Sequence, residues 1–576
     1  MHRQEFCQRQ LQLLDEERQA ELDQESLMRT TWPPKQLERH GLALLSLSVS
    51  NIRSSLGGKT LLDLEPGPGR DPVLPAQQKF RVGDIAALEP VSGKSGDSGG
   101  KRVTGVVYRV LQTRITLSLN ELPETLQERG SIFLVANEVA FKRMKDAICR
   151  LEKAPSNSLL ECLFGEDGYI LPPLPETRLG DDEGDYFDKS LNQSQREAVS
   201  FALASPKIAL IHGPPGTGKT HTCVELIQQL VKRKERVLVC GPSNISVDNL
   251  VERMAQKPGL NIVRLGHPAR LLNSVLEHSL EVRSRSSDEG QIVNDVRSDL
   301  DKTLRSLGKT RRRGDKRALY TEIKELRKEL RSRETRVIDQ ILSGANVVLC
   351  TLNGAASSTL YRLFTQKGEF DTLLIDEASQ ALEAECWVCM DVCFSPKQIP
   401  ILKSKRVVLA GDHCQLPPTV KSSKKSKDPK KNSGLEFTLF DRMLAMYGDS
   451  IKRLLDTQYR ANSVLMEFSS KQLYEGKLHS HSSVKDRLLC QMEGIVETET
   501  TRAALVFFDS SGFELRESAE EDAVGAKSGG SKYNVGEADL VLAHVRELVS
   551  SGVSESEIAI ISPYNAQYAV VILTSM

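Results

Sequence analysis

The chain has 576 residues, of which 39% are hydrophobic and 27% charged, and this length suits roughly three to four folded domains. Lys+Arg and Asp+Glu both number 77, so a global basic charge is excluded and any nucleic-acid contact must use local patches. The charged first residues and the lack of a long apolar run argue against a signal peptide and a membrane-spanning helix. Because the 11 Cys are scattered singly, no disulfide framework is expected, and we expect a reducing compartment, cytoplasm or nucleus.

The first third of the chain consists of three segments that differ in residue pattern and predicted secondary structure. Residues 1–40 are rich in Glu, Gln and Arg and predict a helical stalk, either packed or solvated. Between 41 and 137, short β-like runs separated by turn residues predict a small antiparallel barrel. Residues 138–187 return to a helical stalk and end in an acidic, glycine-containing linker near 178–188.

Strand-like and helix-like segments alternate from 188 to 445, which predicts an α/β domain with a parallel sheet. A charged helical insertion, 272–342, interrupts the alternation, and Lys and Arg outnumber Asp and Glu between Arg297 and Arg336. This pattern fits a solvated helical hairpin, and it fits equally a hairpin that also contacts phosphates. From 446 to 576 the segments IKRLLDTQYR, ALVFFDS and EIAIISPY indicate part of a second α/β domain.

Two short segments allow competing interpretations. The Lys-rich run at 421–431 is more typical of a surface loop than of a nuclear-import signal or a phosphate contact. Cys386, Cys389 and Cys393 are close in sequence, but they lack a second ligand pair and fall in a predicted helix. We therefore expect buried thiols rather than a zinc site.

A phosphate-binding loop is the strongest motif in the sequence. It follows the apolar run IALIH, precedes a helix-like segment, and consists of Gly213, Pro214, Pro215, Gly216, Thr217, Gly218, Lys219 and Thr220. Its glycines let backbone N–H groups face the phosphates, and the helix N-terminus favours negative charge. Lys219 would reach the β- and γ-phosphates, and the Thr220 hydroxyl would ligate Mg²⁺.

The other groups needed for hydrolysis follow two further apolar strands. After TLLI, Asp376 would hold Mg²⁺ through water, and Glu377 would polarise the attacking water. After RVVLAGD, Gln415 could hydrogen-bond the γ-phosphate or that water and so sense the nucleotide state. The spacing around Gln415 alone fits an ordinary loop as well.

The segments LNQSQREAV, HGPPGTGKT, GPSNISVDNLVERM, LIDEASQALEAECW, LAGDHCQLPPT, DTQYR and SPYNAQ occur in this order. Together they resemble the motifs of superfamily 1 helicases that move 5′→3′, and in particular the immunoglobulin mu-binding helicase group. The resemblance covers essentially the whole chain. It implies a RecA-like parallel-sheet motor domain, an incomplete second RecA-like domain, and ATP hydrolysis between the two to drive a helicase or translocase.

The resemblance assigns further roles. Gln195 would read the adenine edge, Tyr459 would stack on the base, Arg460 would act as an arginine finger, and Glu537 would contact the ribose. Contacts with the nucleic-acid backbone are implied for Ser243, Asn244, Thr351, Pro563 and Tyr564. The implied partners are ATP, Mg²⁺ and single-stranded RNA or DNA, together with ribonucleoprotein, replication or translation factors. A monomer without membrane association is expected.

The sequence departs from the family pattern in three places. Ala461 and Asn462 follow Arg460 where Met-His is usual, and Cys414 replaces a Lys. Neither change removes a phosphate ligand, so we expect altered local packing. The chain also stops before the last two family motifs, which suggests a truncated chain. It leaves open a fragment that binds ATP and nucleic acid with weak or no turnover, and, more remotely, a P-loop ATPase that acts on protein.

Overall fold

The computed structural model describes residues 2–54, 60–75, 78–90, 103–119, 129–135, 138–166, 169–171, 186–266, 270–309, 313–367, 370–392, 406–422, 434–519, 532–564, 566–568 and 570–571. These residues divide into two compact units. The first comprises Met1–Gly213 and Lys219–Leu454, and the second comprises Pro214–Gly218 and Leu455–Met576. Within the described ranges, we find no helix with both the length and the apolar character required to cross a membrane.

A seven-stranded parallel sheet forms the centre of the first unit. Its strands are β7 (Ile208–His212), β8 (Val237–Gly241), β9 (Ile262–Arg264), β10 (Val347–Thr351), β11 (Thr372–Ile375), β12 (Arg406–Gly411) and β13 (Lys452–Leu454). They lie in the order β13-β7-β12-β11-β8-β10-β9. Every residue of β7 and β8 is buried, as expected for strands covered on both faces. The predicted α/β class is confirmed.

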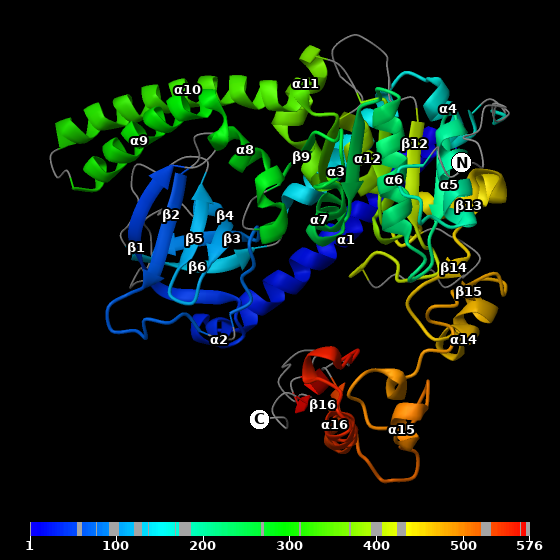
Figure 1. The fold of residues 1–576 in the computed structure, drawn as a ribbon. Coiled ribbons are helices and arrows are strands. Elements are labelled where there is room, and N and C mark those ends of the chain that lie inside the picture. Colours follow the sequence, from blue (N-terminus) through cyan, green and yellow to red (C-terminus); the bar gives the residue numbers. More distant parts are fainter. Residues whose placement is uncertain are drawn as a thin grey trace. The chain divides into compact units, whose positions relative to one another are not determined.

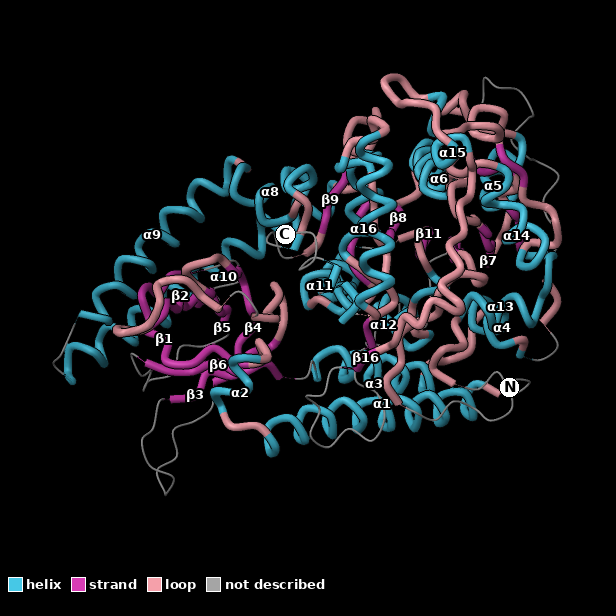
Figure 2. Tube along the Cα trace, turned by 90° about the horizontal axis from the view of Figure 1, so that it is seen from below, coloured by secondary structure: helices cyan, strands magenta, loops and turns pink. Residues whose placement is uncertain are grey.

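Helices cover both faces of this sheet (Figure 2). α5 (Gln193–Ala204) and α6 (Lys219–Lys232) lie on one face, and α7 (Asn244–Met254) packs beside α6. α12 (Glu383–Val392) and α13 (Leu439–Tyr447) lie on the other face, and α11 (Ser358–Lys367) contacts α12. Short 3₁₀ helices connect several of these elements: η5 (Asn273–His278), η6 (Asn353–Ala356), η7 (Ala378–Gln380) and η8 (Gly448–Ile451).

The N-terminal stalk packs against α12 through aromatic side chains. Its helices are α1 (Arg3–Thr31), α2 (Pro34–Arg39), α3 (Glu138–Lys153) and α4 (Ser158–Phe164). The ring centroids of Phe6 and Phe164 are 5.3 Å apart, and those of Phe164 and Trp387 are 5.5 Å apart. Arg442 lies over Phe6 and Phe164 and pairs with the buried Glu383 at 2.7 Å. Arg442, which belongs to α13, therefore links that helix to the stalk and to α12.

We expect Arg442→Met to destabilise the first unit by about 3–5 kcal/mol, because it leaves the Glu383 carboxylate buried without its cation. The Glu383 side chain is only 2% exposed, so water cannot replace the lost partner. Thermal unfolding followed by circular dichroism measures the change. Arg333→Met is the matched control, since the Arg333–Glu329 pair is about half-exposed and should contribute under about 1 kcal/mol. Equal losses of stability in the two variants would contradict the larger contribution assigned to the Arg442–Glu383 pair.

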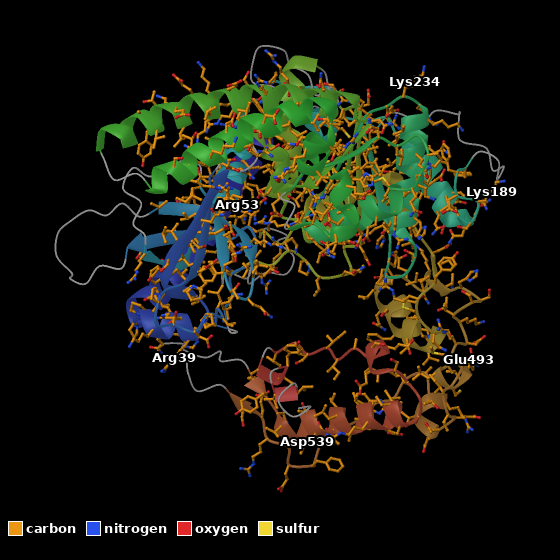
Figure 3. All side chains as sticks on the ribbon, turned by 60° about the vertical axis from the view of Figure 1, so that its left-hand side comes forward. Arg39, Arg53, Lys189, Lys234, Glu493 and Asp539 are labelled. Atoms are coloured by element: carbon orange, nitrogen blue, oxygen red, sulfur yellow. The ribbon has the colours of Figure 1, made fainter. Side chains whose placement is uncertain are left out.

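A closed antiparallel barrel precedes the seven-stranded sheet in sequence (Figure 1). Its strands are β1 (Ala43–Ser54), β2 (Thr60–Pro66), β3 (Ile85–Pro90), β4 (Val103–Val110), β5 (Ile115–Leu119) and β6 (Arg129–Val135), in the order β1-β2-β5-β4-β3-β6. Leucine, isoleucine and valine side chains fill its interior. Arg53, labelled in Figure 3, pairs with the buried Asp63, which also accepts a hydrogen bond from the Thr116 hydroxyl at 2.6 Å. The predicted barrel is confirmed.

The charged insertion forms the predicted helical hairpin. It contains α8 (Leu280–Ser286), α9 (Asp288–Lys309) and α10 (Arg313–Gly344). One side of the hairpin lies along the barrel (Figure 1), where the Ser54 N–H donates to Asp301 Oδ1 at 2.7 Å and Arg327 donates to the Thr60 hydroxyl. Ile52 of the barrel packs against the apolar seam of the hairpin. The hairpin is therefore partly packed rather than wholly solvated, and a phosphate contact by its basic residues stays a prediction.

The second unit contains short elements. They are β14 (Thr457–Gln458), α14 (Ser463–Leu473), β15 (His479–Ser480), η9 (Leu489–Gln491), α15 (Glu499–Arg502), β16 (Ser518–Ala519), β17 (Lys532–Tyr533), α16 (Val535–Ser550) and η10 (Glu555–Glu557). The apolar segments 504–510 and 557–564 are not strands in the structure. A strand requires a paired neighbour, and none lies beside them among the described residues. Their apolar side chains are accordingly open, with Phe507 84% and Ile561 91% exposed.

Several sequence predictions fall wholly or partly outside the described residues. Most of the acidic linker near 178–188 and most of the Lys-rich run at 421–431 lie there, as does Cys393. Cys386 and Cys389 are described, and both are buried in α12. Burial raises the pKa of the Cys386 thiol well above its usual value. This placement agrees with the expected buried thiols.

Candidate nucleotide and nucleic-acid site

The parallel sheet brings most of the predicted site residues of the first unit to one edge. The carboxyl ends of β7, β12, β11, β8 and β10 are neighbours in the sheet, and each is followed by one predicted motif. In open α/β sheets, ligands bind at this edge. The arrangement therefore places the start of the phosphate loop, the acidic pair, Gln415 and the first unit's predicted nucleic-acid contacts at the same edge of this sheet.

The phosphate loop joins β7 to α6. Gly216 and Gly218 have φ values of 78° and 77°, the left-handed conformation that favours glycine. A Cβ on Gly213 would lie 2.7 Å from Lys219 Cβ, so only glycine fits there. The buried Thr217 hydroxyl donates to the Pro214 carbonyl at 2.7 Å and so closes the loop on itself. Thr220 lies in the first turn of α6. The conformation of the loop matches that of loops whose backbone N–H groups bind phosphates.

Lys219 lies against the two predicted catalytic acids. Its Nζ is 2.5 Å from Glu377 Oε1 and 3.4 Å from Asp376 Oδ1. Burial acts to lower the pKa of Lys219, but the charges of Asp376 and Glu377 outweigh it, so the pKa is raised. The lysine is therefore a fully charged ammonium at the point where the phosphates are predicted.

Asp376 and Glu377 occupy different environments although they are adjacent. Asp376 is 4% exposed, and burial raises its pKa. Glu377 has φ 53°, a left-handed conformation that is unusual for a side chain other than glycine. It is held there by its N–H, which donates to Asp376 Oδ1 at 3.0 Å, and by Gln380 Nε2 at 3.2 Å. Such strain often marks a functional position, and it turns the Glu377 carboxylate toward Lys219.

The site offers oxygen ligands of the kind that Mg²⁺ prefers. The Asp376 carboxylate lies beside Lys219, and the Thr220 hydroxyl is on the residue that follows Lys219. A carboxylate and a hydroxyl, completed by water and phosphate oxygens, suit this hard cation. The residues present therefore fit the predicted metal.

A hydrogen-bond network fixes Gln415. The sequence did not identify the other members of this network. Gln415 Nε2 donates to Asp412 Oδ2 at 2.8 Å, and Asp412 Oδ1 lies 2.9 Å from His212 Nε2. The Asp412 N–H donates to the Ser379 hydroxyl at 2.9 Å. Asp412 thereby joins three strand ends: its carboxylate contacts His212 at the end of β7, and its backbone N–H contacts Ser379 after β11. The signal in the sequence was an acid placed directly after a buried strand.

Two departures from the family pattern fit locally. The Cys414 N–H donates to Asp412 Oδ1 at 3.1 Å, so its backbone serves the same network. Burial raises the pKa of the Cys414 thiol to about 11, which makes it unreactive at neutral pH. In the second unit, Asn462 caps α14 by accepting the Val464 N–H at 2.9 Å. Both residues serve local packing, as expected.

Gln195 has a structural task that the prediction did not foresee. It is 5% exposed in the first turn of α5, and its Oε1 accepts the Asn192 N–H at 2.9 Å. Asn192 in turn accepts the Gln195 N–H, which completes a capping box. The side-chain oxygen of Gln195 is thus engaged by the helix, and its contact with adenine stays a prediction.

The second unit presents Tyr459 and Arg460 on a fixed turn. Gln458 is fully buried, and its Oε1 accepts the N–H groups of Arg460 and Ala461 at 2.7 and 2.8 Å. The Tyr459 N–H donates to the Gly216 carbonyl at 2.8 Å. The ring of Tyr459 is 38% exposed, and the Arg460 side chain is also exposed. Both are available for the roles of base stacking and arginine finger, which stay predictions.

We expect Tyr459→Ala to weaken ATP binding by about 5- to 100-fold, because stacking of an aromatic ring on a base is worth about 1–3 kcal/mol. Titration of a fluorescent ATP analogue measures the effect. Tyr568→Ala is the matched control, since Tyr568 is a 56% exposed tyrosine of the same unit without a predicted role. Unchanged affinity in Tyr459→Ala would remove this residue from the base-binding site.

The remaining predicted residues of the second unit are exposed. Glu537 lies in the first turn of α16 and accepts the Ser510 hydroxyl at 3.1 Å. No hydrogen bond or ion pair in the described part of the chain joins Glu537 to Tyr459 or Arg460. Pro563 and Tyr564 are open to solvent, with Tyr564 45% exposed. Their predicted contacts with ribose and nucleic acid are untested.

The predicted nucleic-acid contacts of the first unit are neighbours. Thr351 pairs with Gly241 across β10 and β8, and Ser243 and Asn244 begin α7 two and three residues after Gly241. Ser243 is exposed and caps α7 by accepting the Ser246 N–H at 3.1 Å. The Thr351 hydroxyl accepts the Gly354 N–H at 3.1 Å. A helix N-terminus and two strand ends therefore form a surface suited to a phosphate backbone.

Comparisons with known proteins agree with this geometry. The profile "Helicase SMUBP-2/HCS1, 1B domain" matches residues 7–132, and two profiles described as AAA domains match 190–423 and 435–573. The DNA polymerase alpha-associated DNA helicase A of Schizosaccharomyces pombe is 37% identical over 99% of this chain and 83% of its own length. The chain belongs to the SMUBP-2/HCS1 helicase family.

Other SMUBP-2/HCS1 relatives show the same extent of similarity. The DNA-binding protein SMUBP-2 of Mus musculus is 40% identical over 98% of this chain, and the Saccharomyces cerevisiae helicase A is 35% identical over 98%. The chain spans 54% of the mouse protein and 84% of the yeast protein. Membership confirms the family resemblance and makes the chain an ATP-binding helicase-class enzyme. The first profile coincides with most of the barrel, which is thus a family feature rather than a separate module.

Proposed function

We propose that this chain is an ATP-dependent motor that moves 5′→3′ along single-stranded DNA or RNA. The single observation that carries the proposal is the contact of Lys219 with Asp376 and Glu377 at the edge of the parallel sheet. It joins a phosphate-binding cation, a metal-binding carboxylate and a candidate base in one place. Mg²⁺ would be held by Thr220 and Asp376 and would neutralise charge on the phosphates.

Hydrolysis would use the chain's own residues as follows. Lys219 binds the phosphate oxygens, and Glu377 accepts a proton from the attacking water. Gln415, fixed by Asp412, lies at the neighbouring strand end and would sense whether the γ-phosphate is present. Tyr459 and Arg460 of the second unit would bind the base and the transferred phosphoryl group.

Nucleic acid would lie along the surface formed by Ser243, Asn244 and Thr351. These residues offer hydroxyl and amide groups and a helix N-terminus, all of which can hydrogen-bond to phosphate oxygens. Contacts of this kind fix the backbone without reading sequence. The proposal is therefore a motor that tolerates many sequences, and the printed names of the relatives, which mention DNA, support the DNA alternative.

Strand separation tests the direction of movement. Duplexes carrying a single-stranded tail at the 5′ or at the 3′ end of the loading strand are incubated with the chain and ATP, and release of a labelled strand is measured. The proposal predicts release from the 5′-tailed duplex and none without ATP. Release only from the 3′-tailed duplex would contradict the proposed polarity. A comparison of DNA and RNA versions of each tail shows on which nucleic acid the chain moves.

A further inference from the structure

Arg264 is a charged residue inside the buried parallel sheet. It is the last residue of β9 and is completely buried. Its Nε donates to Asp248 Oδ1 at 2.8 Å, and Asp248 is 1% exposed. The second oxygen of Asp248 accepts the Leu272 N–H at 2.9 Å. Because apolar residues of similar size usually stabilise such a position at least as well, stability alone does not account for this ion pair.

The guanidinium of Arg264 also reaches the predicted nucleic-acid surface. Its Nη2 donates to Asn244 Oδ1 at 3.0 Å, and its Nη1 donates to the Leu265 carbonyl. The fork of Arg264 therefore spans a buried carboxylate on the inside and the side chain of Asn244 at the surface. All its nitrogens are directed by fixed acceptors, so the guanidinium has one orientation.

This contact decides which end of the Asn244 amide is offered to a ligand. Arginine donates and never accepts, so it holds the amide oxygen. The Nδ2 group of Asn244 has no hydrogen-bond partner among the residues that the structure describes, and Asn244 is only half-buried. Phosphate oxygens accept and never donate. With the oxygen retained by Arg264, Asn244 presents the donor that a phosphate requires.

We infer that Arg264 is a positioning residue for nucleic-acid binding, which acts by holding the Asn244 amide with its Nδ2 toward the phosphate backbone. Asp248 fixes Arg264 in turn. The inference rests on the proposed function, because it assigns the group that Arg264 orients to the nucleic-acid surface. Arg264 itself does not touch the nucleic acid.

A double-mutant cycle on the full chain tests the inference. Affinity for a fluorescently labelled single-stranded DNA oligonucleotide is measured for Asn244→Ala, Arg264→Met and the double variant. Each single change should weaken binding by about tenfold, the range for one hydrogen bond to a charged group. The double variant should bind as Asn244→Ala does, because Arg264 acts through Asn244. ATP affinity should stay unchanged in all three.

Arg264→Met leaves the Asp248 carboxylate unpaired and buried, so a second variant guards against loss of folding. Arg264→Gln with Asp248→Asn removes both charges and keeps two side chains that can bond to each other, while the shorter amide no longer reaches Asn244. It should reproduce the tenfold loss. Arg283→Met is the matched control, because Arg283 donates to Asn261 Oδ1 and the Ile262 carbonyl at the opposite end of β9. It should lower stability without changing the affinity for DNA.

The outcomes separate the inference from the proposed function. If the losses from Asn244→Ala and the Arg264 variants add, Arg264 is purely structural and the inference is overturned. If Asn244→Ala binds single strands as tightly as the unaltered chain, the inference is overturned while the proposed function stands. If the unaltered chain itself binds no single strand, the proposed function fails.

Discussion

Lys219→Ala is expected to abolish ATP turnover, with a loss of at least about a hundredfold, because it removes the cation that would hold the transferring phosphoryl group. The loss should be large because the lysine also neutralises two neighbouring acids. Its Nζ contacts Glu377 at 2.5 Å and Asp376 at 3.4 Å, and without it their charges repel the phosphates. ATP affinity should fall with turnover. Phosphate release and binding of a fluorescent ATP analogue measure the two effects.

Lys189→Ala serves as the control for this variant. Lys189 is exposed and lies at the surface of the first unit, where Figure 3 labels it. Its removal changes the net charge by the same amount and should leave turnover within twofold, since surface changes away from a site have small effects. Retained turnover in Lys219→Ala would show that this loop does not bind the phosphates of ATP.

Glu377→Gln is expected to keep ATP binding and to reduce hydrolysis by about 10²–10⁴-fold, the usual contribution of a general base. The amide has the same shape as the carboxylate, so the strained turn at Glu377, with φ 53°, keeps its contacts. Lys219 keeps Asp376 as its partner at 3.4 Å. The variant should therefore trap bound ATP, which filter binding of labelled nucleotide and a phosphate-release assay distinguish.

Glu436→Gln is the matched control, because Glu436 is an exposed glutamate of the same unit. Its turnover should equal that of the unaltered chain. If Glu377→Gln instead loses ATP affinity together with hydrolysis, Glu377 acts in binding and is not simply the base.

The sequence predicts those features of the fold and site that are determined by residues close together in the chain. The phosphate loop combines glycines, an apolar strand and a following helix, and these features lie next to each other in the chain. The buried strand before Asp376 is recognised by its apolar run, so the placement of the acids at a strand end follows. The barrel and the helical hairpin likewise follow from changes in hydrophobic period.

Features that depend on distant residues could not be predicted. Nothing near Arg264 in sequence shows that it is buried, because Asp248 and Asn244 lie on another element. The ring of interactions around Asp412 joins strands that are far apart in the chain. The apolar segments 504–510 and 557–564 depend on distant residues in the same way, because an apolar run becomes a strand only beside a partner.

Gln195 shows how one short pattern serves two interpretations. The family motif assigns it to adenine, whereas the same residues, Asn192 followed three positions later by Gln195, are also a signal for a capped helix. The structure contains that cap. A local signal of this kind can be recognised in the sequence alone.

The most direct test of a nucleic-acid-driven motor is the ATPase rate of this chain, measured with and without single-stranded DNA and RNA. We expect at least one of these strands to stimulate phosphate release strongly, and we expect Lys219→Ala to abolish the stimulated rate. Tight ATP binding with a rate that neither strand raises would contradict this expectation. That result would describe a protein that binds nucleotide and does not couple its hydrolysis to nucleic acid.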